Sequence, residues 1–153
     1  VSIVSIAIFG MVKSFRLLNR VAQRFKVPKA CKELADVVAK EHGHIHRCKD
    51  LSGPALIRLL ERCDAFRRPE RFASVLLACE CDARGRLGLS EQPYPQATWL
   101  QLLHAAASAI DTQATAQQAA QAPEFAKYKG EWIAQQITAA REAAIKPLLA
   151  AHP

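Results

Sequence analysis

Apolar residues recur at helical spacing through most of this sequence, and no segment shows sustained two-residue alternation. Between residues 14 and 26, for example, leucine, valine and phenylalanine share one side, while Arg16, Arg20 and Arg24 recur every fourth position on another. Such spacing is typical of amphipathic helices, whereas half-buried strands alternate every two residues. The pattern therefore predicts an all-α fold, with six to seven helices in a compact helical array and no sheet.

Prolines and glycines indicate where these helices begin and end. Pro28, Pro54 and Pro69 each suit a helical first turn, where a missing N–H has no cost. Ser52 is a candidate N-cap, and Gly85 follows the expected end of a helix. The predicted helices cover residues 14–26, 28–46, 54–66, 69–85, 96–110 and the segment after Pro123, with 112–122 as a weak helix or a connector.

The helix expected at 96–110 has an apolar face that we expect to point inward. Helical spacing favours an inward stripe made of Trp99, Leu102, Leu103, Ala106 and Ile110. This assignment places Leu102 in the core.

Positive charge is concentrated near the start of the chain. The sequence has 21 Lys and Arg against 14 Asp and Glu. Residues 13–32 include seven basic residues and no acidic one, whereas residues 91–124 have three acids and no Lys or Arg. This distribution favours an anionic partner, although a solvated face that keeps the protein soluble would look the same.

The cysteines and the first residues of the chain give indications of its cellular location. Five cysteines, an odd number with no signal peptide before them, indicate reduced thiols and a cytoplasmic protein. Cys79 and Cys81 are two apart and would point to nearly opposite sides of a helix, which disfavours a structural zinc site. The apolar run 1–10 is too short to span a membrane, and its lack of an initiating Met suggests a cut chain or a misread start.

Candidate catalytic or metal-binding residues are few. The sequence has no phosphate-binding loop, no nucleophile elbow, no His-Glu-x-x-His and no Asp-x-Asp pair. His42 and His46 lie one helical turn apart and could share a metal ion. Asp82 could bind a divalent cation together with Glu80, but the arginines that follow could equally pair with both acids.

Several segments together resemble a known family. The main segment is Leu77–Arg86, followed by Tyr94-Pro95-Gln96 and Trp99-Leu100. Further matching segments are Arg24–Pro28, Glu41-His42 with Ile45-His46, Leu60–Arg71 and Tyr128-Lys129-Gly130. From about residue 14 to residue 145 the chain is very similar to the C-terminal half of bacterial CCA-adding tRNA nucleotidyltransferases of the multifunctional type.

This resemblance implies an architecture and a partner. It implies an unmatched segment at 1–13, an HD-like and body helical region at 14–90, and a tail helical region at 91–153. It implies tRNA as the partner. The short apolar run predicts no membrane association, and the apolar helix faces leave a homo-oligomer possible. The RNA-binding residues expected are Arg16, Arg20, Arg24, Arg84, Arg86, Lys127 and Lys129.

The resemblance also implies which activities to expect. The family's nucleotide transfer uses Mg²⁺, ATP and CTP in an N-terminal head, which we expect to be absent, so no catalytic residue is assigned. Its HD domain uses Ni²⁺ or Mg²⁺ to hydrolyse cyclic or 2′-phosphate ends; His42 and Asp82 are the candidate ligands here, but Gly43 replaces the aspartate of a His-Asp pair. The alternatives to a tRNA-binding segment are thus an HD phosphohydrolase and a non-enzymatic helical interaction module.

Overall fold

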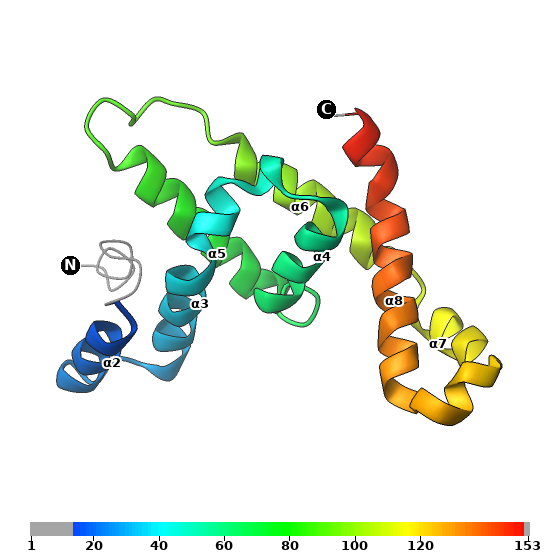
Figure 1. Ribbon diagram of the computed structural model, residues 1–153. Helices are drawn as coiled ribbons and strands as arrows, with labels where there is room; N and C mark the ends of the chain where they lie inside the picture. Colours follow the sequence, from blue (N-terminus) through cyan, green and yellow to red (C-terminus); the bar gives the residue numbers. More distant parts are fainter. Residues whose placement is uncertain (1–13, 152–153) are drawn as a thin grey trace.

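The computed structural model describes residues 14–151 as a helical array without strands in that range (Figure 1). The predicted all-α class is therefore confirmed. The unmatched segment 1–13, with its apolar run, lies outside the described residues. The elements are α2 (Ser14–Arg24), α3 (Lys29–His46), the 3-10 helix η1 (Cys48–Asp50), α4 (Gly53–Arg62), α5 (Pro69–Arg84), α6 (Pro95–Ser108), α7 (Thr112–Ala120) and α8 (Pro123–Ala151).

Helix boundaries follow the proline and capping signals. Pro54, Pro69 and Pro95 occupy first-turn positions of α4, α5 and α6. Ser52 stands at the N-cap of α4, although its side chain makes no capping hydrogen bond. The weak helix α7 is capped by Asp111, whose carboxylate accepts a hydrogen bond of 2.9 Å from the Ala114 N–H.

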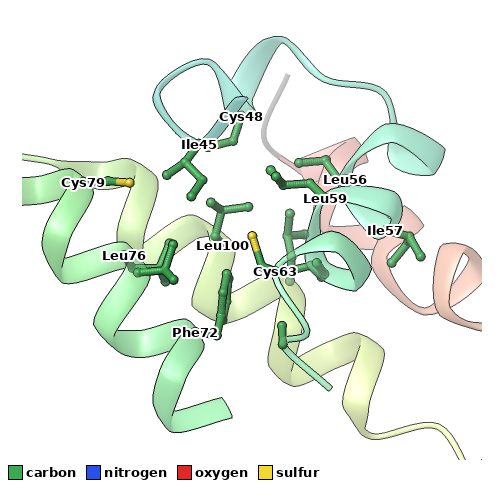
Figure 2. Packing of buried hydrophobic residues seen from close by; sticks show 14 of the residues in the cluster. Ile45, Cys48, Leu56, Ile57, Leu59, Cys63, Phe72, Leu76, Cys79 and Leu100 are labelled. Atoms are coloured by element: carbon green, nitrogen blue, oxygen red, sulfur yellow. The ribbon is translucent and has the colours of Figure 1, made fainter. Parts of the chain in front are cut away.

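One large hydrophobic core joins most of these helices. It gathers side chains from α3, η1, α4, α5, α6 and α8, and Figure 2 shows Leu100 of α6 among Ile45, Leu59, Cys63 and Leu76. The core thus takes residues from both sides of position 90, and the division into two regions there stays a prediction. A separate small cluster joins Leu18 of α2 to Ala35 of α3.

The inward face of α6 differs from the expected one. Leu100, Leu103 and Ala107 are buried, whereas the side chain of Leu102 is 43% exposed. The prediction that Leu102 lies in the core was wrong. Leu100 and Leu103 are three residues apart and share a side of the helix, and packing against α5 and α8 selects that side.

The last helix closes the array over α4 and α6. Arg141 of α8 places its guanidinium carbon 3.6 Å from the centroid of the Phe66 ring and one nitrogen 3.5 Å from the Glu61 carboxylate. Lys129 interrupts α8 with non-helical dihedral angles (φ 38°, ψ −111°). In Figure 1, α2 and the pair formed by α7 and the start of α8 lie at opposite ends of the molecule.

No helix within residues 14–151 combines the length and the apolar character needed to cross a bilayer.

Candidate functional site

One side of α2 carries cations that form no ion pair with the acids of residues 14–151. Leu18 and Ala22 form its buried side, against α3, while Arg16, Arg20 and Arg24 are exposed. The helix contains no acidic residue, and none of the three arginines forms an ion pair with any acid among residues 14–151. These guanidinium groups are therefore available to an external anion.

The turn after α2 extends this surface. The Val27 N–H donates to the Ala22 carbonyl at 3.0 Å, and Lys26 adopts φ 48°, so the chain reverses tightly before α3. Lys26 is exposed and unpaired within the described residues, whereas Lys29 and Lys32 pair with acids one turn further along α3. We call the set Arg16, Arg20, Arg24 and Lys26 the α2 cationic surface.

The arginines at the end of α5 have a different environment. Arg84 lies 2.8 Å from the Glu80 carboxylate and donates from Nε to the Ser90 carbonyl at 2.9 Å. Arg86 lies 3.5 Å from the Asp82 carboxylate. The interpretation of these residues as a helix-end set of ion pairs is thus confirmed, while their contact with RNA stays a prediction.

A polar cluster links α3, α5 and the loop before α6. His46 Nε2 lies 3.2 Å from the Asp82 carboxylate, and the Tyr94 hydroxyl lies 2.9 Å from His46 Nδ1. Because the carboxylate only accepts, His46 carries its proton on Nε2 and accepts from Tyr94 at Nδ1. Burial lowers the pKa of His46, with Asp82 opposing this shift, and burial raises the pKa of Tyr94. Above pH 6.5 the cluster therefore favours the neutral imidazole.

Sequence reasoning missed most of this cluster. It paired His46 with His42, whose ring centroid lies 5.9 Å away, and not with Asp82 or Tyr94. The partners of His46 are 36 and 48 residues distant in sequence, so helical spacing carries no signal for them.

The cluster makes stability depend on pH through His46. Its pKa in the folded chain lies below the ordinary value of 6.5, so the unfolded chain takes up the proton first as the pH falls. The contribution to the free energy of unfolding is complete above pH 6.5 and is lost as the pH falls from there through the lowered pKa. We expect urea midpoints measured from about pH 8 to about pH 5 to fall less in His46→Gln than in the unsubstituted chain. An identical fall in both would contradict this.

The candidate metal ligands His42 and Asp82 both lie next to His46. His42 is buried and donates from Nδ1 to the Val38 carbonyl at 3.0 Å, which leaves Nε2 as its one possible donor atom to a metal. Asp82 already accepts from His46 and pairs with Arg86. Within residues 14–151, no three His, Cys, Asp or Glu side chains are grouped so as to hold a metal ion. Metal ligation by His42 and Asp82 stays a prediction.

Lys127 and Lys129 lie at the interruption of α8, and both are exposed. The start of α8, to which they belong, lies at the opposite end of the molecule from α2 (Figure 1). The predicted RNA-binding residues therefore lie in three separate parts of the fold, which are α2, the end of α5 with the loop after it, and the first part of α8.

Comparison with known proteins identifies the chain's relatives. It is 52% identical over 141 residues, 92% of its length, to the multifunctional CCA protein of Polaromonas naphthalenivorans. It is 58% identical over 104 residues, 68% of its length, to that of Verminephrobacter eiseniae. The chain is related to multifunctional CCA proteins. This result confirms the resemblance drawn from the sequence.

The match covers only part of each multifunctional CCA protein. The chain spans 32% of the Polaromonas naphthalenivorans relative and 25% of the Verminephrobacter eiseniae relative. A third relative, from Cupriavidus taiwanensis, is 46% identical over 93% of the chain, and the chain spans 32% of that relative. No family model and no solved structure matches the chain.

Proposed function

We propose that this chain is a tRNA-binding segment of a CCA-adding tRNA nucleotidyltransferase, an enzyme of tRNA 3′-end maturation and repair. The observation that carries the proposal is the α2 cationic surface, whose four exposed cations lack acidic partners among residues 14–151. Nucleic acid backbones are bound mainly by such cations. Under this proposal, nucleotide addition with Mg²⁺, ATP and CTP would take place outside the part of the relatives that this chain matches.

The surroundings of the other cations support the choice of α2. Arg84 and Arg86 already pair with Glu80 and Asp82, so binding a phosphate there would require exchange of an existing partner. On binding phosphates, the cations of α2 would break no ion pair within residues 14–151, and the nucleic acid would release its condensed counterions. Counterion release favours binding at low salt, so the α2 surface should supply most of the electrostatic affinity.

The salt dependence of tRNA binding tests this proposal. Four phosphate contacts predict a log–log slope of about −3.6, so affinity should fall about 150-fold between about 50 mM and about 200 mM salt. A transcribed tRNA carrying a fluorophore, titrated with the full chain at several salt concentrations, gives the slope directly. A flat salt response, or no binding at the lowest salt, would contradict the proposal.

A further inference from the structure

An apolar ridge runs along α2 beside its cations. Leu17 is 48% exposed, Phe25 is 67% exposed, and Val21 between them is half-buried. Leu17 and Val21 are four residues apart in α2 and share one side of the helix. Phe25 follows the last residue of α2, and its N–H donates to the Val21 carbonyl at 3.0 Å, so it continues the same spacing. The ridge borders an open hollow of about 540 Å³. Among residues 14–151, it is lined by Leu17, Arg20, Val21, Gln23, Arg24 and Phe25.

The ridge lies between the side packed on α3 and the cationic side. At 100° per residue, Phe25 falls close to Leu18, and Leu17 falls beside Arg20 and Arg24 on the other flank. The Arg24 guanidinium carbon is 5.8 Å from the centroid of the Phe25 ring. An occupant of the ridge would thus meet an aromatic ring together with two guanidinium groups that form no ion pair within residues 14–151.

These features match the chemistry of an unpaired nucleotide. Such a nucleotide offers a flat π face for Phe25 and phosphates for Arg20 and Arg24, which are one helical turn, about 6 Å, apart along the axis. In a duplex the faces of the bases are covered by their neighbours, so a duplex could use the cations and leave Phe25 without a partner. A guanidinium beside the ring also suits a base stacked on it.

We propose that Phe25 stacks on an unpaired base of an RNA strand whose flanking phosphates are bound by Arg20 and Arg24. This inference rests on the proposed RNA-binding function and specifies the form of RNA that α2 takes. It predicts a preference for single-stranded over duplex RNA that depends on the aromatic ring, whereas phosphate binding alone predicts none.

The test compares two RNA forms on three variants of the full chain. Fluorescence anisotropy measures binding of a labelled single-stranded RNA and of the duplex of the same length. Phe25→Ala should weaken single-strand binding about 10-fold or more, and leave duplex binding within about 2-fold. Phe25→Trp should retain single-strand binding. Leu87→Ala, at a fully exposed residue in the loop before α6, is the control and should change neither affinity.

Three outcomes would overturn the inference. Equal affinities of Phe25→Ala and the unsubstituted chain for the single strand would remove the stacking role while leaving the RNA-binding proposal intact. An equal loss on single strand and duplex would point to general damage to the surface. In a third arm, sedimentation with phosphatidylserine vesicles, a loss of vesicle binding in Phe25→Ala without a loss of single-strand binding would assign the ridge to anionic lipid. Failure of the unsubstituted chain to bind either RNA would instead contradict the proposed function.

Discussion

Reversing the charge of Arg16, Arg20 and Arg24 together is expected to weaken tRNA binding about 100-fold at low salt. Each arginine is exposed and lacks an acidic partner within residues 14–151, so each is free to bind a phosphate. A loss of about 1 kcal/mol for each contact gives about two powers of ten in the dissociation constant. The log–log salt slope should also fall in magnitude by about three, since each lost contact removes about one unit.

A matched control separates the α2 surface from net charge. Lys49, Arg58 and Lys146 are exposed cations outside α2 that form no ion pair within the described residues. Replacing all three by glutamate lowers the formal net charge of +7 by the same amount as the α2 triple. The control should retain most of the affinity and of the slope. Equal losses in the two triples would show that total charge, and not the α2 surface, determines binding.

Replacing Leu100 by alanine is expected to lower the free energy of unfolding by about 2 to 5 kcal/mol. The Leu100 side chain is fully buried in the core shared by α3, α4, α5, α6 and α8. Truncation removes apolar contacts and leaves a cavity that close-packed neighbours cannot fill. Urea unfolding followed by far-ultraviolet circular dichroism measures the change, and one shared core predicts a single transition that moves as a whole.

Leu102→Ala provides the control on the same helix. Its side chain is 43% exposed, so the same truncation should cost less than about 1 kcal/mol. Equal shifts in the two variants would contradict the assigned inward face of α6. Two separate transitions, of which Leu100→Ala moves only one, would instead support independent regions before and after position 90.

Local features of the molecule could be predicted from the sequence. The positions of the helices, the ion pairs Glu80–Arg84 and Asp82–Arg86, and the arginine stripe of α2 all rest on residues three to five positions apart. Helix geometry alone brings such residues together, so they need no knowledge of the fold. The lack of acidic residues in α2 could also be predicted from the sequence, because it concerns one helix and not the way the helices pack.

Contacts between distant segments were decided only by the tertiary structure. Packing of α5 and the following loop against α3 places Asp82 and Tyr94 on His46, and packing of α8 over α4 stacks Arg141 on Phe66. Packing of α6 against α5 and α8 also determines that Leu100, and not Leu102, faces the core. The sequence determined the helices and the charges each one carries, because these depend on neighbours along the chain. Which cations are neutralised across helices, and which apolar residues stay exposed, depends on how whole helices pack, and that information is spread over the entire core.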